Sequence, residues 1–244
     1  MTLLQATDIR KAFGGIQALD SCSITVEKGS ITGLIGPNGS GKTTLFNVIT
    51  GYERSDGGKV EFNGLDISRY TPNRIFGMGI GRTFQLTRIF PRLSVIENMH
   101  VAIQRKGLAS LLGRWSASSE HARALRLLEF VGLTHLKDAP AGSLSYGQRK
   151  LLELAFILVA EPQVILLDEP AGGVNPTLIG QLSDRIRDLN QQGVTFLIVE
   201  HNMEFVMGLC DKVMVLHRGA KLAEGAPAAV RANPVVLDAY LGDS

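Results

Sequence analysis

The chain contains 244 residues, of which 45% are hydrophobic and 20% charged, a composition typical of a soluble globular protein with a sizeable core. Its 25 basic and 23 acidic residues leave a formal charge of only +2, which gives no electrostatic reason to expect a nucleic-acid partner. The two cysteines show no CxxC pattern, which argues against a disulfide framework. Charges close to the N-terminus argue against a signal peptide. The chain has no apolar run of roughly 18 residues, which argues against a membrane span.

Short β-like segments alternate with turns in the first third of the chain. Three of them have the composition of antiparallel strands: residues 3–9, 21–27 and 59–67. The third contains Asn63-Gly64, a pair that favours a two-residue hairpin turn. Residues 31–36, ITGLIG, instead form a continuous apolar run, which is typical of a strand buried on both faces.

The middle of the chain has a helical pattern. Apolar residues recur with helical spacing in three segments: residues 95–105, 120–133 and 146–160. Two further buried strands, 164–169 and 194–200, flank the helical segment 176–193, and this alternation suggests parallel βαβ units. The tail reads as a hairpin over 212–225 and a short helix. We therefore expect an α/β domain in which the helical block is an insertion.

A glycine-rich loop follows the first buried strand. GPNGSGKT, Gly36 to Thr43, matches GxxxxGK[ST] between a strand and a helical segment. Gly39 and Gly41 allow successive backbone N–H groups to turn toward phosphate oxygens, and the helix N-terminus adds partial positive charge. Lys42 would supply a charge to the β- and γ-phosphates, and Thr43 a hydroxyl to Mg²⁺. The nucleotide-binding residues expected here are Gly36, Pro37, Asn38, Gly39, Ser40, Gly41, Lys42, Thr43 and Thr44.

Polar side chains also follow the later buried strands. Adjacent strand residues point in opposite directions, so Asp168 and Glu169, at the end of VILLDE, cannot have the same role. Asp168 fits the Mg²⁺ partner that phosphate-loop proteins require, and Glu169 lies where it could orient and polarise the attacking water. His201 follows the next buried strand, where a contact to the γ-phosphate is expected. Gln85 precedes the helical block and is a candidate ligand of the metal and the water.

Together these motifs resemble those of the ATP-binding cassette (ABC) ATPases, over essentially the whole chain. That family carries a phosphate loop, a glutamine loop, a signature, an Asp-Glu strand end and a switch histidine in this order, and the signature here is LSYGQ, residues 144–148. The resemblance implies the ABC ATPase fold in one domain, 1–244. A nucleotide core with a parallel sheet and an antiparallel β lobe would comprise residues 1–85 and 161–244, and a helical lobe residues 86–160.

The signature also implies a second ATPase subunit, identical or paralogous. In the family, two cassettes close head to tail around two ATP molecules, and each signature faces the nucleotide of the other subunit. Ser145 would then donate to the γ-phosphate, Gly147 would allow close backbone approach, and Gln148 would line the same edge. The aromatic residue that stacks on adenine, commonly tyrosine, would be Phe13. Asn175 stands where many members have aspartate.

Finer detail resembles the ATPase subunits of branched-chain amino-acid importers. The stretches that carry this resemblance are RTFQLTRIFPRLSVIENMHVA, AGGVNP and AEGAPAAVRANPVVLDAYLG. It implies ATP and Mg²⁺ as ligands, transmembrane permease subunits as partners and a peripheral place at the cytoplasmic face of the membrane. Lipopolysaccharide export and urea import are the alternative transport functions. The chain has a single cassette and a near-neutral charge, which disfavours an ATPase that acts on DNA or ribosomes. Residues 107–119 form an insertion. We expect it either to pack on the helical lobe or to help dock the membrane subunit.

Overall fold

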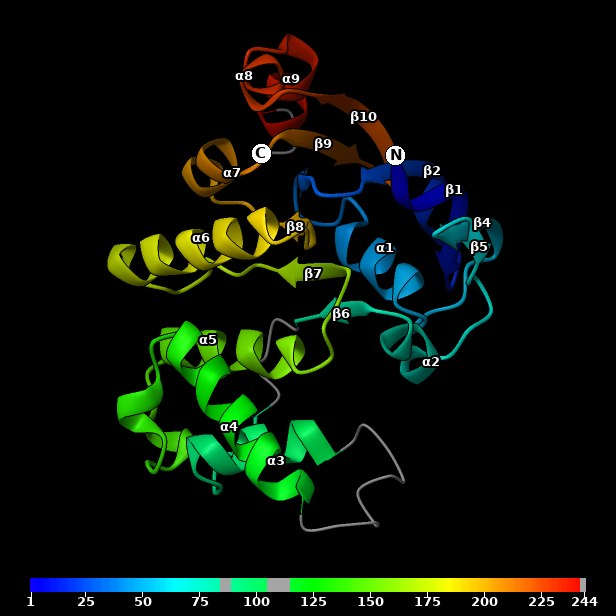
Figure 1. The fold of residues 1–244 in the computed structure, drawn as a ribbon. Coiled ribbons are helices and arrows are strands. Elements are labelled where there is room, and N and C mark those ends of the chain that lie inside the picture. The colour runs from blue at the N-terminus through cyan, green and yellow to red at the C-terminus, as the bar shows by residue number, and fades with distance from the viewer. Residues whose placement is uncertain (84–88, 105–114, 242–244) are drawn as a thin grey trace.

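The computed structural model describes the whole chain except residues 84–88, 105–114 and 242–244 (Figure 1). Its strands are β1 (Thr2–Phe13), β2 (Ile16–Glu27), β3 (Ile31–Ile35), β4 (Gly57–Phe62), β5 (Leu65–Asp66), β6 (Ile80–Arg82), β7 (Val164–Asp168), β8 (Thr195–Val199), β9 (Lys212–His217) and β10 (Ala220–Gly225). Its helices are α1 (Lys42–Ile49), α2 (Pro72–Gly77), α3 (Val95–Gln104), α4 (Trp115–Phe130), α5 (Tyr146–Leu158), α6 (Pro176–Gln191), α7 (Met203–Leu209), α8 (Pro227–Arg231) and α9 (Pro234–Leu241). In the part of the chain that is described, no helix combines the length and the apolar character needed to cross a membrane.

The antiparallel lobe has the strand order β2-β1-β4-β5. Phe62 of β4 pairs with Leu65 of β5, which leaves Asn63 and Gly64 as a two-residue turn with φ angles of 51° and 75°. Positive φ at both turn positions is what a type I′ hairpin turn requires, and asparagine and glycine adopt it at low cost. The predicted hairpin is confirmed.

The larger sheet has the strand order β10-β9-β3-β8-β7-β6. All its neighbouring strands pair in parallel except β10, which pairs antiparallel with β9 at the edge. The predicted parallel sheet and terminal hairpin are confirmed. The sequence indicates a short β-like segment ahead of Gln85, and the structure has β6 there. The short helices α2 and α7 are not predicted, because so few residues do not show a helical period.

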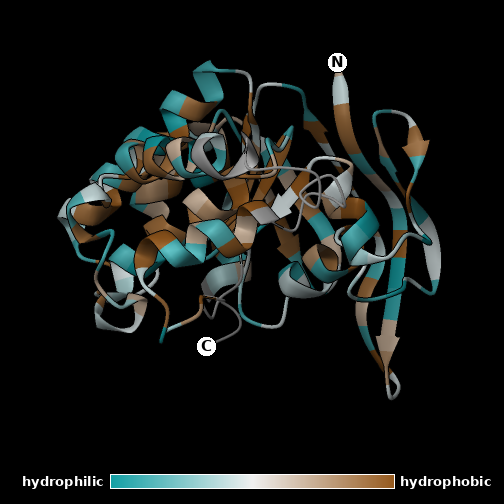
Figure 2. Cartoon of the chain, turned by 60° about the horizontal axis from the view of Figure 1, so that its bottom comes forward, coloured by the Kyte–Doolittle hydropathy of each residue, from teal (hydrophilic) through white to brown (hydrophobic). Residues whose placement is uncertain are grey.

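Alternate residues of each buried strand contribute to two different hydrophobic cores, one on each face of the larger sheet. In β7, Ile165 and Leu167 belong to the core that contains apolar residues of α5 and α6. Val164 and Leu166 belong to the core shared with α1 and the antiparallel lobe. Figure 2 shows the result: hydrophobic strands lie inside, and hydrophilic stretches of the helices lie outside. Burial on both faces explains why these strands read as continuous apolar runs.

The helices α3, α4 and α5 lie between β6 and β7 in the chain and gather beyond β6 in Figure 1. They fall within the predicted insertion, residues 86–160. They pack through buried residues such as Met99, Leu128 and Leu152, which join the core on one face of the larger sheet. The exact limits of the helical lobe stay a prediction. Most of the 107–119 insertion lies outside the described residues, so its two expected roles stay predictions.

Candidate nucleotide site

The predicted site residues follow parallel strands at one edge of the larger sheet. Val199, the last residue of β8, pairs in register with Asp168 of β7 and with Leu34 of β3. From these strand ends the chain continues into the phosphate loop, into Glu169 and into His201. The carboxyl ends of parallel strands meet at one edge, where open α/β sheets bind their ligands. The structure therefore brings the three motifs together.

The phosphate loop turns on glycines in the left-handed region. Gly36 has a φ of 151° and Gly41 a φ of 102°. A Cβ at Gly36 would lie 2.1 Å from the carbonyl oxygen of Leu216, and a Cβ at Gly41 would lie 2.5 Å from that of Ala18. Helix α1 begins directly afterwards at Lys42, so the unpaired N–H groups of its first turn face the loop. This strand–loop–helix geometry favours an anion.

Lys42 lies against its own loop. Its ammonium group donates to the carbonyl oxygens of Gly36 and Pro37, at 2.8 Å each. Burial lowers the pKa of Lys42, and the nearby carboxylates of Glu169 and Asp168 oppose this shift. A phosphate group would offset the effect of burial and offer a stronger acceptor than the two carbonyls.

The outer residues of the loop are open to solvent. Asn38, Gly39 and Thr43 are exposed, whereas Ser40 is buried. Phe13, at the end of β1, is 44% exposed, and the ammonium group of Lys11 lies over one face of its ring, 4.9 Å from the ring centre. Hydroxyl and backbone groups of the loop are therefore accessible to a ligand.

Asp168 is held by a residue that sequence reasoning missed. Arg82 of β6 donates through Nη2 to the Asp168 carboxylate at 3.1 Å, and both side chains are 6% exposed. Arg82 also donates to Asn47 Oδ1 and Thr50 Oγ1, at the end of α1, across 2.8 and 3.0 Å. Nothing in the local sequence marks Arg82, because its partner lies 86 residues further along the chain. The predicted ligand Gln85, three positions later, lies outside the described residues.

Glu169 and His201 come together where β7 and β8 end. His201 Nδ1 lies 3.7 Å from Glu169 Oε1. Glu169 has a φ of 48°, and its N–H donates to the carbonyl oxygen of Val199 at 2.9 Å. Such a φ is uncommon for a residue other than glycine, and values of this kind cluster at functional sites. The exposed imidazole and the half-buried carboxylate can contact one ligand between them.

The signature residues begin α5 and have partners within the chain. Ser145 Oγ accepts the N–H of Gln148 at 3.3 Å, and Gln148 Oε1 accepts the N–H of Ser145 at 2.9 Å, which makes a capping box. Gly147 is buried, and a Cβ there would lie 2.5 Å from Leu178 Cδ1 of α6. Asn175 caps α6 by accepting the N–H of Leu178 at 2.9 Å. These residues therefore stabilise the starts and the packing of α5 and α6 within the chain. Their predicted roles toward a second subunit stay predictions.

Comparison with known proteins places this architecture in a family. The model of the ABC transporter family matches residues 19–172. The probable branched-chain amino acid transport ATP-binding protein LivG of Archaeoglobus fulgidus is 42% identical over 99% of this chain and 96% of its own length. This chain belongs to the ABC transporter family. The high-affinity LivG protein of Escherichia coli K12 is 36% identical over 99% of this chain and 98% of its own.

Solved structures of ABC cassettes agree with this assignment. One ATP-binding cassette of an ABC transporter, crystallised in its ADP conformation, superimposes with a TM-score of 0.90 at 39% identity, covering 99% of both chains. A second family model, for the branched-chain amino acid ATP-binding cassette transporters, matches residues 220–244. The expected ABC ATPase fold is confirmed, with its parallel sheet and its antiparallel β lobe, and the chain is an ATP-binding protein.

The cassette has a groove of about 880 Å³ between the core and the helical lobe. Aromatic rings from both sides line it, namely Phe76 of α2, Phe90 before α3 and Phe156 of α5. Phe76 and Phe90 are 41% and 42% exposed. Arg82 also lines this groove, so it adjoins the ion pair that holds Asp168.

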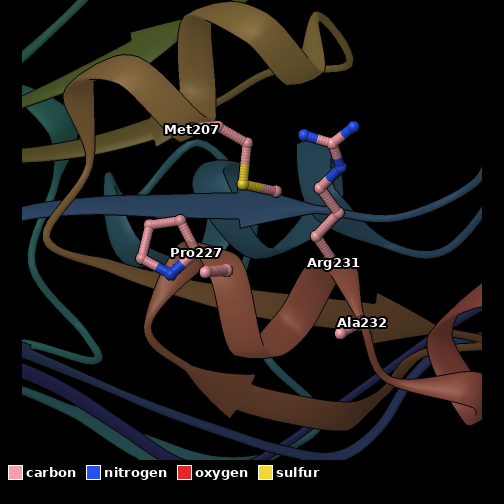
Figure 3. Close-up of a pocket in the computed structure, with 5 residues that line it drawn as sticks. Met207, Pro227, Arg231 and Ala232 are labelled. Carbon is pink, nitrogen blue, oxygen red and sulfur yellow. The ribbon is translucent and has the colours of Figure 1, made fainter.

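A smaller hollow of about 390 Å³ lies between α7 and α8 (Figure 3). Met207 of α7 lies on one side of it. Pro227, Ala228 and Arg231 of α8 lie on the other side, together with Ala232, which follows α8. None of these lining residues is among those predicted to bind nucleotide or metal, although four of them lie in the C-terminal stretch that resembles branched-chain amino-acid cassettes.

Proposed function

We propose that this cassette hydrolyses ATP to power the import of branched-chain amino acids. The match of residues 220–244 to the branched-chain amino acid cassette model supports this, and so do the names of full-length relatives at 36–42% identity. In this proposal the chain is a peripheral subunit at the cytoplasmic face of the membrane, bound to transmembrane permease subunits. ATPases of lipopolysaccharide export and urea import are the alternatives.

The observation that carries the proposal is the meeting of Lys42, Glu169 and His201 at one sheet edge. Lys42 would transfer its hydrogen bonds from the two loop carbonyls to the β- and γ-phosphates. Glu169 would orient the attacking water and accept its proton, and the imidazole 3.7 Å away would contact the γ-phosphate. The positioning of water beside an immobilised phosphate is the main requirement of this chemistry.

The oxygen donors at this edge fit a magnesium ion. Thr43 offers an exposed hydroxyl in the first turn of α1, and Asp168 offers a carboxylate. Both are oxygen ligands, which Mg²⁺ prefers. When bound, Mg²⁺ would neutralise charge on the phosphates. Arg82 fixes the orientation of the Asp168 carboxylate through its buried hydrogen bond. Gln85 is the further ligand expected from the sequence.

A second cassette completes each site in this proposal. Ser145, Gly147 and Gln148 stand at the N-terminus of α5, whose partial positive charge suits an anion. A second copy or a paralogue would place its own α5 against the phosphates held by this chain, while the exposed ring of Phe13 stacks on adenine.

The groove of about 880 Å³ is the proposed docking place of the permease. Exposed apolar rings that line a concave surface are typical of a protein contact. Phe76→Ser and Phe90→Ser should each reduce co-purification with the permease and leave the ATPase rate of the isolated cassette unchanged. Leu65→Ser is the matched control, because Leu65 is 48% exposed on β5, outside the groove. Equal loss of the complex in all three variants would contradict docking in the groove.

Transport measurements in the host test the substrate. Deletion of the gene should abolish high-affinity uptake of labelled leucine, isoleucine and valine, and a plasmid copy should restore it. A plasmid copy carrying Glu169→Gln should not restore it. If uptake of these amino acids persists while urea uptake or lipopolysaccharide export fails, the substrate assignment is wrong.

A further inference from the structure

Glu200 is a buried carboxylate between two loops of the site. It follows β8 directly, and the residue is 1% exposed. Its Oε1 accepts the backbone N–H of Ala171 at 2.7 Å. Its Oε2 accepts the N–H groups of His201 and Asn202, at 2.9 Å each. One side chain thus satisfies three backbone donors.

These three donors come from two different segments. Ala171 lies two residues after Glu169, in the loop that leaves β7, and is 29 residues away from Glu200 in the chain. His201 and Asn202 form the turn that leaves β8. The carboxylate therefore ties the loop of the water-orienting glutamate to the turn of the histidine. A buried backbone N–H needs a partner, so this arrangement fixes both segments relative to each other.

The relative placement of the two segments sets a distance that the chemistry depends on. Glu169 Oε1 and His201 Nδ1 lie 3.7 Å apart, a separation longer than that of an ordinary hydrogen bond. Glu169 also has its backbone in the left-handed region, at a φ of 48°, a conformation that persists only where its surroundings hold it. The hydrogen bond from Ala171 to Glu200, together with the two bonds that hold Glu200 in the turn of His201, supplies such surroundings.

We propose that Glu200 is a positioning residue for ATP hydrolysis, which sets the placement of Glu169 relative to His201 through its three backbone hydrogen bonds. This inference rests on the proposed roles of Glu169 and His201. Glu200 itself touches neither nucleotide nor water in this scheme. A carboxylate suits the task because both of its oxygens accept, whereas a glutamine would turn one NH₂ group toward an N–H donor.

The test compares Glu200→Gln with the wild type in the purified full-length chain. A displacement of the catalytic pair by about 1 Å costs about 100-fold in rate, so kcat for ATP should fall by about that factor. The KM for ATP and the affinity for a fluorescent ATP analogue should stay unchanged, because the phosphate loop is intact. A kcat within about twofold of the wild type would overturn the proposal, because a twofold change corresponds to only about 0.4 kcal/mol in activation free energy.

Asp211→Asn provides the matched control. Asp211 Oδ2 accepts the N–H of Ile31 at 2.8 Å, so it is also a carboxylate that joins a loop to the backbone of the larger sheet. Asp211 directly precedes β9 and bonds to the first residue of β3, so it lies away from the strand ends that carry the site. Its substitution should lower thermal stability and leave kcat unchanged. If Glu200→Gln and Asp211→Asn change kcat and melting temperature alike, Glu200 has only a structural role and the proposal is wrong.

A double-mutant cycle with His201→Ala separates positioning from general damage. If Glu200 acts by placing the Glu169–His201 pair, the double variant should lose much less than the product of the two single losses. Multiplicative losses would contradict the inference. Should Glu200→Gln fail to fold, Glu200→Asp replaces it, because a side chain one methylene shorter keeps two accepting oxygens but cannot reach both segments.

The proposed function and this inference fail in different ways. Glu169→Gln with a normal turnover rate would overturn the assignment of the site. Loss of turnover in Glu169→Gln together with normal turnover in Glu200→Gln would overturn only the role of Glu200.

Discussion

The guanidinium group of Arg82 donates to the carboxylate of Asp168 across 3.1 Å, and both side chains are 6% exposed. This pair joins β6 to the end of β7, and two further hydrogen bonds join Arg82 to Asn47 and Thr50 at the end of α1. The edge strand, the helix that follows the phosphate loop and the predicted metal ligand therefore form one buried network. Such a network is costly to break from one side, because the remaining charge stays buried.

Arg82→Ala should lower the free energy of unfolding by about 3–5 kcal/mol, because it leaves the Asp168 carboxylate buried without its cation. Urea denaturation followed by circular dichroism measures this change. Arg187→Ala is the control, since Arg187 pairs with Asp184 at 3.2 Å on the surface, with side chains 47% and 69% exposed. It should change stability by about 0–1 kcal/mol. Similar losses in both variants would show that the buried pair contributes no more than a surface pair.

Glu169→Gln should bind ATP as tightly as the wild type, lose turnover and form an ATP-dependent dimer. The amide cannot take a proton from water, and it removes negative charge near the γ-phosphate. Nucleotide binding, phosphate release and size-exclusion chromatography with ATP measure the three effects. A chain that holds ATP but stays monomeric would argue against a sandwich of two identical cassettes, and mixing with a paralogue would then test the heterodimer.

Ser145→Asp should separate the two roles of the signature serine. Aspartate is as good an N-cap as serine, so α5 should keep its stability, while the added charge repels the phosphates of a second subunit's nucleotide. Turnover should therefore fall although the melting temperature does not. Ser145→Ala is the comparison, because it loses the cap to Gln148 and about 1 kcal/mol of stability. Full turnover in Ser145→Asp would restrict the signature serine to its structural role.

Both cysteine thiols should be unreactive in the folded protein at pH 8. Burial raises the pKa of Cys22 from 9.0 to about 11 and that of Cys210 from 9.0 to about 12. Because the thiolate is the nucleophile, labelling with a disulfide reagent should be slow in buffer and fast in urea. Rapid labelling of the folded chain at pH 8 would contradict this burial, and Cys22→Ser would identify which thiol reacts.

The same shift predicts how the thiols affect stability at alkaline pH. The folded pKa of Cys22 lies above its unfolded value, so its contribution is complete below pH 9 and is lost as the pH rises from 9 to about 11. Cys22→Ser should reduce the fall in the free energy of unfolding over this range, measured by urea titrations at several pH values. If the free energy of unfolding falls equally in the variant and the wild type over this pH range, the raised pKa of Cys22 is contradicted.

The sequence by itself determined the features whose physical cause is local. The phosphate loop needs only a strand, a run of glycines that can adopt positive φ, and a helix start at Lys42, and all of these lie within a few neighbouring residues. The Asn63-Gly64 turn is fixed by the φ preference of two residues. The buried strands are recognisable because burial on both faces requires continuous apolar residues.

Only the tertiary structure decided which distant residues support these motifs. Arg82 and Glu200 look like ordinary charged residues in the sequence, since their partners Asp168 and Ala171 lie 86 and 29 residues away. The order β10-β9-β3-β8-β7-β6 brings those partners together, and no local preference encodes it. Hydrogen bonds between strand ends depend on which strands become neighbours, and that is set by the packing of the whole chain around its two cores.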